Sequence, residues 1–134
     1  MRKTRRLMEA FFDTDYAVRD GGVWRVVRIG ERHPGLETLV KSTGVFITGW
    51  NPFGKRASAA ANDARNRAMA RILAARGYRT LPHQGIGSDG AWAEDGFFVR
   101  DMRAKTARNL ARTFGQLAIV AIARGRKAEI VWAF

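Results

Sequence analysis

The sequence contains no cysteine among its 134 residues. Disulfide bonds and thiolate metal sites are therefore excluded, and a cytoplasmic location is the expectation that fits this composition best. Histidine is scarce as well, because His33 and His83 are the only two and they lie in separate segments. No histidine pair has the spacing of a metal site. We therefore expect neither a metal nor another cofactor.

Long apolar runs are also missing. The longest, from Leu117 to Ala123, is far shorter than the roughly 18 residues that a membrane span needs. The basic N-terminal segment 1–6 resembles the start of a signal peptide, but Glu9 and Asp13 interrupt the apolar region that would have to follow. We expect no membrane span and no secretion signal.

Acidic residues are half as frequent as basic ones. The chain has 12 Asp and Glu against 24 Lys and Arg, which gives a formal net charge of +12. Such a field attracts polyanions, because each neutralised phosphate releases counterions. Nucleic acid or another phosphate-rich anion is the functional interpretation of this charge. The structural alternative is a basic surface that only keeps a small protein soluble.

Hydrophobic periodicity and turn residues predict the order of the elements. In the N-terminal part we expect a helix over 4–18, a strand over 23–29, a loop over 30–35, a strand over 45–50 and a helix over 57–76. The helix over 57–76 would bury Ala61, Ala64, Ala68 and Ile72. In the C-terminal part we expect strands over 78–83 and 95–101, a helix capped by Asp101 that ends near Phe114, and strands over 117–123 and 127–134.

This element order predicts a single α+β domain over residues 1–134. The part from 44 to 134 has the β-α-β-β-α-β order of a ferredoxin-like sandwich with an added C-terminal strand. Residues 1–40 then form an N-terminal helix and strand extension. In such a sandwich both helices cover one face of an antiparallel sheet.

Basic residues recur at helical spacing on the outer faces of the two core helices. Acidic partners are nearly absent from these helices, which favours a binding surface over a merely solvated one. The predicted nucleic-acid-binding residues are Lys55, Arg56, Arg67, Arg71, Arg103, Lys105, Arg108 and Arg112.

Two further segments are candidate ligand sites. The apolar strand 45–50 runs into Asn51 and Pro52, and a helix that carries Asn62 follows, so hydrogen-bonding groups gather at the edge of a rigid core. In the glycine-rich loop 84–95, Glu94 lies close to Trp92 at the entry of an apolar strand. A carboxylate there can have a raised pKa and act as a general base, or it can bind donor groups of a ligand. The structural alternative is an ion pair with one of the many arginines.

The segments 46–52, 62, 92–99 and 107–118 resemble a bacterial family of proteins of unknown function, numbered 3293. The resemblance covers most of residues 44–125 and implies no established activity. It implies polar site positions at Asn51, Asn62, Glu94 and Gln116. These four residues would form either a ligand site or a buried polar network that locks the strand to the helices.

Three functions therefore remain open. The leading hypothesis is recognition of nucleic acid or another phosphate-rich anion through the basic helix faces. The second is an enzyme that acts on a nucleotide or nucleic acid, with Glu94 as acid or base and Asn51, Asn62, Trp92 and Gln116 as ligand-binding residues. The third is an interaction or inhibitor module for an acidic protein partner. The sequence does not decide the oligomeric state.

Overall fold

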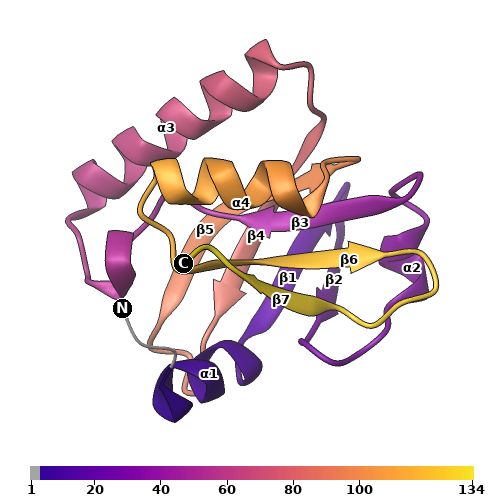
Figure 1. The fold of residues 1–134 in the computed structure, drawn as a ribbon, viewed down its shortest axis with the longest axis horizontal. Coiled ribbons are helices and arrows are strands. Elements are labelled where there is room, and N and C mark those ends of the chain that lie inside the picture. Colours follow the sequence, from indigo (N-terminus) through magenta and orange to yellow (C-terminus); the bar gives the residue numbers. More distant parts are fainter. Residues whose placement is uncertain (1–3) are drawn as a thin grey trace.

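Seven strands form one antiparallel, curled sheet in the computed structural model, which describes residues 4–134 (Figure 1). The first three residues of the basic N-terminal segment lie outside the described residues. The strand order across the sheet is β2-β1-β4-β5-β3-β6-β7. Every neighbouring pair is antiparallel, so both ends of the chain contribute strands to the same sheet.

The elements alternate along the chain as follows. The helices are α1 (Arg5–Phe12), α2 (Pro34–Glu37), α3 (Ala59–Ala75) and α4 (Ala104–Thr113), and the short 3-10 helix η1 spans Pro52–Gly54. The strands are β1 (Asp15–Asp20), β2 (Val23–Val27), β3 (Thr43–Ile47), β4 (Thr80–Ile86), β5 (Ala93–Arg100), β6 (Ala118–Ala123) and β7 (Glu129–Trp132).

The central strands are buried on both faces, which explains their nearly continuous apolar sequences. Along β3, Val45 and Ile47 pack into a core with α3 and α4, whereas Phe46 between them belongs to a second core on the other face. Residues 119–122 of β6 alternate between the two cores in the same way. This two-residue period is the ordinary consequence of strand geometry.

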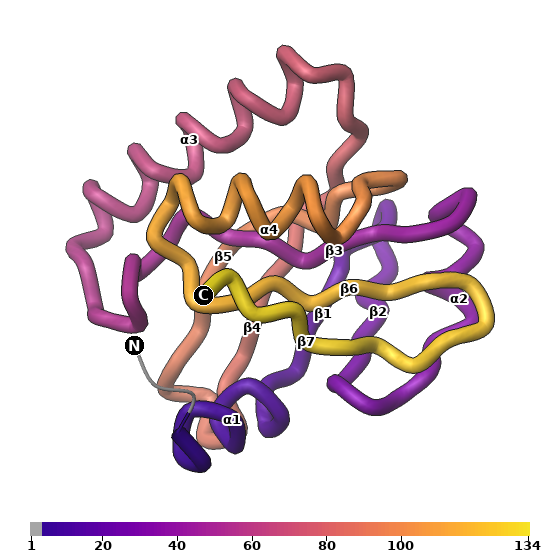
Figure 2. The backbone as a smooth tube through the Cα atoms, viewed as in Figure 1, coloured from indigo at the N-terminus to yellow at the C-terminus, as the bar shows by residue number. Residues whose placement is uncertain are grey.

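The second core fills the concave side of the curled sheet. Tyr16 from β1, Val27 from β2 and Leu36 from α2 meet Phe46 and Phe98 there. α1 lies on the opposite side of the sheet from α3 and α4 (Figures 1 and 2). The sheet is therefore covered on one face by two long helices, while its other face curls around a core near which α1 and α2 lie.

The N-terminal half of α3 docks through polar groups rather than through an apolar stripe. Asn66 accepts a hydrogen bond from the Gly49 backbone N–H at 2.8 Å, and Arg65 Nε donates to the Gly49 carbonyl at 2.6 Å. A Cβ atom at position 49 would lie 3.1 Å from Asn66 Oδ1, so the close approach favours glycine there. The end of β3 is thus fixed to α3 at the point where Asn51 follows.

The α+β class predicted from the sequence is confirmed, and the two long helices and the predicted strand segments are present, with shifted ends. The sheet has seven strands, two more than the core prediction contained, because β1 and β2 extend it beyond β4. Pro34–Glu37 is a helical turn where we expected a loop. No helix within residues 4–134 is long and apolar enough to cross a membrane.

The predicted helix over 4–18 was wrong beyond Phe12. The helix ends at Asp13, and Asp15–Asp20 is a strand that pairs with both β2 and β4. Pairing with distant strands determines that this segment is a strand, because Tyr16, Ala17 and Val18 are all buried once β1 lies between two neighbouring strands. A local helical pattern does not contain that information.

Two finer predictions for the core helices were also wrong. Asp101 does not cap α4, because Arg103 holds the cap position and Asp101 Oδ1 instead accepts a hydrogen bond from the Lys41 backbone N–H at 2.7 Å. In α3, Ala61 and Ala64 are exposed, since the polar docking described above turns Asn62 inward.

Candidate functional site

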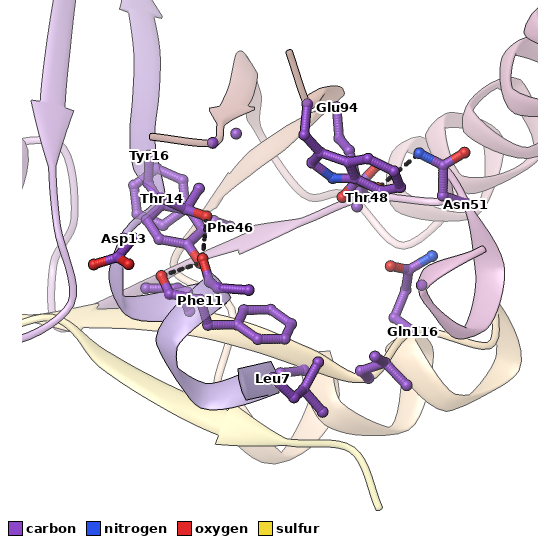
Figure 3. Close-up of a pocket in the computed structure, with 18 of the residues that line it drawn as sticks. Leu7, Phe11, Asp13, Thr14, Tyr16, Phe46, Thr48, Asn51, Glu94 and Gln116 are labelled. Atoms are coloured by element: carbon purple, nitrogen blue, oxygen red, sulfur yellow. Dashed lines mark hydrogen bonds between the residues drawn. The ribbon is translucent and has the colours of Figure 1, made fainter. Parts of the chain in front are cut away.

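A cavity of about 580 Å³ lies between α1 and the end of the curled sheet (Figure 3). Cavities of this size commonly hold small ligands. One wall is apolar and includes Leu7 and Phe11 of α1. The facing wall carries Asn51, Glu94 and Gln116. We call this cavity the α1 pocket.

Glu94 is the central polar residue of the α1 pocket. It lies near the start of β5, half-buried, and its Oε2 accepts a hydrogen bond of 2.8 Å from Asn51 Nδ2. Burial raises the pKa of the Glu94 carboxyl above its ordinary value, and the hydrogen bonds from Asn51 and Trp92 only partly counter that effect. The carboxyl is therefore both held in place and made more basic.

Asn51 occupies the turn that links β3 to α3. Its backbone is in the left-handed region with φ of 48°, a conformation that asparagine tolerates better than most residues. Its Oδ1 accepts hydrogen bonds from the Ala57 backbone N–H at 2.9 Å and from Asn62 Nδ2 at 3.1 Å. All polar groups of this side chain therefore serve to close the loop and to orient Glu94.

Asn62 supports Asn51 from α3 and is only 4% exposed. Its Oδ1 accepts a hydrogen bond from the Asn51 backbone N–H at 2.9 Å. Asn62 is not among the residues that line the α1 pocket. It therefore acts behind the site, as part of a polar lock, whereas Asn51 and Glu94 reach the pocket itself.

Gln116 follows α4 and lies across the pocket from α1. Its Nε2 donates a hydrogen bond to the Trp50 carbonyl at 2.9 Å. Figure 3 shows the amide oxygen of Gln116 turned toward the middle of the pocket. Because the nitrogen is engaged with the backbone, the group that Gln116 offers to a ligand is an acceptor.

Trp92 lines the α1 pocket and carries the Arg56 guanidinium on its ring. The guanidinium carbon of Arg56 lies 4.5 Å from the centroid of the Trp92 ring, and Arg56 also donates to the Ala91 carbonyl at 3.3 Å. This stacking fixes an exposed positive charge beside an aromatic wall of the pocket. Lys55 is exposed next to it in the chain.

α1 forms a cover that rests on the sheet without burying a residue completely. Its last turn is held by Tyr16, whose hydroxyl donates to the Phe11 carbonyl at 3.1 Å, and by Thr14, whose hydroxyl donates to the Ala10 carbonyl at 2.7 Å. Phe11 also makes an edge contact with Trp132, with ring centroids 5.4 Å apart. α1 is therefore anchored mainly at its C-terminal end.

His83 lies on β4, lines the pocket and is 7% exposed. Its Nδ1 lies 2.9 Å from the Ala17 carbonyl, and burial lowers its pKa to about 4. Its ring stacks on Tyr16 and meets Phe46 edge-on. Within residues 4–134, no three or more His, Asp or Glu side chains are arranged to hold a metal ion.

The structure thus brings Asn51, Trp92, Glu94 and Gln116 of the predicted site to one pocket and places Asn62 behind it. Tyr16 and the residues of α1 were not among the predicted site residues. Tyr16 was missed because its segment was assigned to the first helix. The i, i+4 spacing of Leu7 and Phe11 indicates an apolar helix face, but it does not indicate which part of the protein that face covers.

The predicted nucleic-acid-binding residues fall into two groups. Lys55 and Arg56 lie beside the α1 pocket. The others lie on or next to α3 and α4; all of these are exposed except Arg108, whose Nε is buried. None of the ion pairs among residues 4–134 involves a side chain of α3 or α4, so these positive charges are not neutralised by neighbours.

Comparison with protein families gives one match. The model of a family described as protein of unknown function, DUF3293, matches residues 47–119, more than half of the chain. The chain belongs to the DUF3293 family. Searches of curated proteins and of solved structures found no match. The DUF3293 segment contains Thr48, Asn51, Glu94 and Gln116 of the pocket lining, whereas α1 lies outside it.

Proposed function

We propose that this protein binds a nucleotide, either free or within single-stranded nucleic acid, and that the α1 pocket receives its base. One observation carries the proposal: a strongly cationic protein contains a pocket whose polar wall presents hydrogen-bond acceptors. A nucleotide combines the two complementary features, since its phosphates are anionic and its base is flat and carries donor groups.

The positions of the cations support a base inside the pocket and a phosphate outside it. Among the pocket-lining residues within 4–134, Arg6 is the only arginine or lysine, whereas Asp13, Asp89 and Glu94 are acidic. The interior is therefore not suited to a phosphate. Arg56, fixed over Trp92, places a positive charge beside the pocket instead, where the phosphate of a bound nucleotide would lie.

The basic faces of α3 and α4 extend the same proposal to longer strands. Arg67, Arg71, Lys105 and Arg112 are exposed and take part in none of the ion pairs formed within residues 4–134. They lie across the sheet from α1, so they would contact phosphates away from the bound base. A polyanion held this way would bind with strong dependence on salt.

Fluorescence anisotropy with a short labelled single-stranded DNA, a matching RNA and unlabelled mononucleotides as competitors tests the proposal over a salt series. We expect binding at low salt, a steep loss of affinity as salt rises, and competition by mononucleotides for the pocket. Failure of all three probes to bind at low salt would overturn the proposal. The affinities of the mononucleotides, compared with those of the strands, show which of the two is the preferred ligand.

Arg56→Gln provides the site-specific arm, with Arg126→Gln as the control that loses the same charge. Arg126 is exposed in the turn between β6 and β7, away from the pocket. We expect Arg56→Gln to weaken binding by about tenfold and to lower the salt slope by about 1, the effect of one lost phosphate contact. Equal effects of both substitutions would contradict a role for Arg56 beyond net charge.

A second candidate function is catalysis, because burial raises the pKa of the Glu94 carboxyl above its ordinary value and so makes its carboxylate a better proton acceptor. Glu94 would then be the acid or base, and Asn51 and Gln116 would orient the substrate. Incubation with RNA, DNA and nucleotides, followed by chromatography of products, tests this function. A product that disappears in Glu94→Gln supports it, and an activity unchanged in that variant excludes it.

We also infer a ferredoxin-like unit within the sheet. In chain order, β3, α3, β4, β5, α4 and β6 follow the β-α-β-β-α-β pattern predicted within residues 44–134. Their strands are neighbours in the sheet, in the order β4-β5-β3-β6. The remaining strands then extend this unit at both edges. Under this inference the α1 pocket lies on the face that α3 and α4 leave open.

A further inference from the structure

The wall of the α1 pocket that carries Asn51, Glu94 and Gln116 offers mainly hydrogen-bond acceptors. The Glu94 carboxylate has about four lone-pair positions, of which the Asn51 amide uses one and Trp92 supplies a further hydrogen bond. The Gln116 oxygen faces the pocket, since its nitrogen donates to the Trp50 carbonyl. A ligand that fits this wall must supply donors.

His83 adds a third acceptor. The Ala17 carbonyl accepts only, so the Nδ1 atom that lies 2.9 Å from it carries the proton. The Nε2 atom of the neutral ring then keeps its lone pair. It lies on the side of Gly85, another residue of the pocket lining, at 3.8 Å from where a Cβ atom of that residue would be.

The side-chain donors near this wall are largely engaged. Asn51 Nδ2 donates to Glu94, and Gln116 Nε2 donates to the Trp50 carbonyl. The Thr48 hydroxyl donates to the Asp95 carbonyl at 2.6 Å. The wall is therefore poorly matched to a ligand edge that alternates donors with acceptors.

The common bases differ in how many adjacent donors their pairing edge carries. Guanine presents an imino N–H and an amino group side by side, which match the two oxygens of one carboxylate. Adenine and cytosine place an amino group next to a ring-nitrogen acceptor, and uracil places one N–H between two carbonyl oxygens. A carboxylate pairs with two adjacent donors only in guanine.

We propose that the base preferred by the α1 pocket is guanine, with its imino and amino groups donating to Glu94 and with Gln116 as a nearby acceptor. This inference rests on the proposed function and specifies its ligand. Phe11 and Trp92 provide aromatic surface on the pocket walls for the ring. A cationic amine or guanidinium also carries donors, but the net charge of +12 opposes its approach.

Calorimetric titration of the wild-type protein with the 5′-monophosphates of guanosine, inosine, adenosine, cytidine and uridine tests the preference without any mutation. Inosine differs from guanosine by the amino group alone. We expect guanosine monophosphate to bind about tenfold tighter than inosine monophosphate, the value of one hydrogen bond to a charged group. We expect the other three to bind more weakly than both.

Glu94→Gln is the matched variant, because it keeps the size of the side chain and an oxygen for Asn51 but replaces one acceptor by a donor. We expect the preference for guanosine over adenosine monophosphate to fall to near unity. Glu129→Gln on the exposed side of β7 removes the same charge far from the pocket and should leave the preference intact. A preference that survives Glu94→Gln would overturn the role of this carboxylate.

Recognition within single-stranded nucleic acid is tested by comparing the affinities of two DNA strands. Each is a nine-nucleotide thymidine DNA that carries either one central dG or one central dA. Tighter binding of the dG strand supports guanine recognition within nucleic acid, whereas a preference seen only with mononucleotides assigns the pocket to free nucleotides. Nucleotide binding with equal affinities for all bases overturns the guanine inference but leaves the proposed function standing. Binding of arginine amide, in a protein that binds no nucleotide, overturns both.

Discussion

Asn51 and Glu94 are joined by a side-chain hydrogen bond of 2.8 Å, although they lie 43 residues apart in the chain. The bond links the turn after β3 to the start of β5 and fixes one carboxylate oxygen. Because Asn51 is itself held by Asn62 and by the Ala57 backbone, the orientation of Glu94 is set before a ligand arrives. Such preorganisation lowers the cost of binding.

The first prediction concerns the stability cost of ionised Glu94. Burial raises the pKa of this carboxyl in the folded state, so folding favours its protonated form. The associated stability is complete below the unfolded-state pKa and is lost as pH rises through the folded-state pKa. Glu94→Gln mimics the protonated carboxyl, so we expect it to unfold at a higher urea concentration than wild type at neutral pH.

The pH dependence supplies the check for Glu94. The advantage of Glu94→Gln should shrink as pH falls and vanish near about pH 4, where the unfolded carboxyl is also protonated. Tyr16 and His83, which line the same pocket, are uncharged near neutral pH, because burial raises the pKa of the phenol and lowers that of the imidazole. A variant less stable than wild type at neutral pH would contradict the prediction.

The second prediction concerns the polar lock behind the pocket. Asn62→Ala removes the acceptor for the Asn51 backbone N–H and one donor to Asn51 Oδ1 in a buried place. We expect the free energy of unfolding to fall by about 2 kcal/mol, because buried groups lose their partners. Urea unfolding followed by tryptophan fluorescence measures this loss.

Asn109→Ala is the control for Asn62. Asn109 lies exposed on α4, so its replacement should change the free energy of unfolding by no more than about 0.5 kcal/mol. If the two variants were equally stable, the Asn51–Asn62 contact would not be a stabilising lock. Guanosine monophosphate binding should also weaken in Asn62→Ala, since Asn51 then no longer holds Glu94.

Part of the polar side of the pocket follows from local sequence rules. An apolar strand that stops at an Asn-Pro turn places polar groups at a sheet edge, and Glu94 marks the entry of the next apolar strand. The residue types of Asn51 and Glu94 therefore indicated hydrogen bonding, whereas Gln116 was implied only by the resemblance to the family.

The apolar half of the site depends on pairing between distant segments. Tyr16 reaches the pocket because β1 pairs with β4, in a register that sets Tyr16 opposite Gly85. Nothing within residues 4–18 specifies that register, and the short apolar pattern there fits a helix as well as a strand. The cavity also requires the curl of a seven-stranded sheet, which no local pattern determines.

The third prediction concerns His83. Burial lowers its pKa to about 4 in the folded state, whereas the unfolded imidazole titrates near about 6.5. The stability of the neutral ring is therefore complete above the unfolded-state pKa and is lost as pH falls through the folded-state pKa. This linkage amounts to about 3 kcal/mol, an order-of-magnitude value.

NMR titration of the histidine ring protons tests the His83 prediction directly. We expect no change in the His83 resonances between neutral pH and about pH 5. In the same range the unfolding free energy of wild type should decrease, and the decrease should be smaller in His83→Gln. A His83 resonance that titrates near pH 6.5 would show that the ring is not buried as described.

The fourth prediction concerns the close approach of β3 and β5 next to the pocket. A Cβ atom at Gly96 would lie 2.5 Å from the Ile47 carbonyl oxygen and 2.9 Å from the Thr48 Cβ atom. Neither neighbour is the end of a flexible side chain, so the strands themselves must separate. We expect Gly96→Ala to lower the free energy of unfolding by about 3 kcal/mol.

Gly22→Ala isolates this steric effect from the general cost of replacing glycine. A Cβ atom at Gly22 would have no heavy atom within 4 Å. The free energy of unfolding of Gly22→Ala should therefore stay within about 0.5 kcal/mol of the wild-type value. Gly96→Ala should also weaken ligand binding, because Glu94 precedes Gly96 by two residues on β5 and Thr48 lines the same pocket. Wild-type stability in Gly96→Ala would mean that β3 and β5 do not approach each other as closely as their register implies.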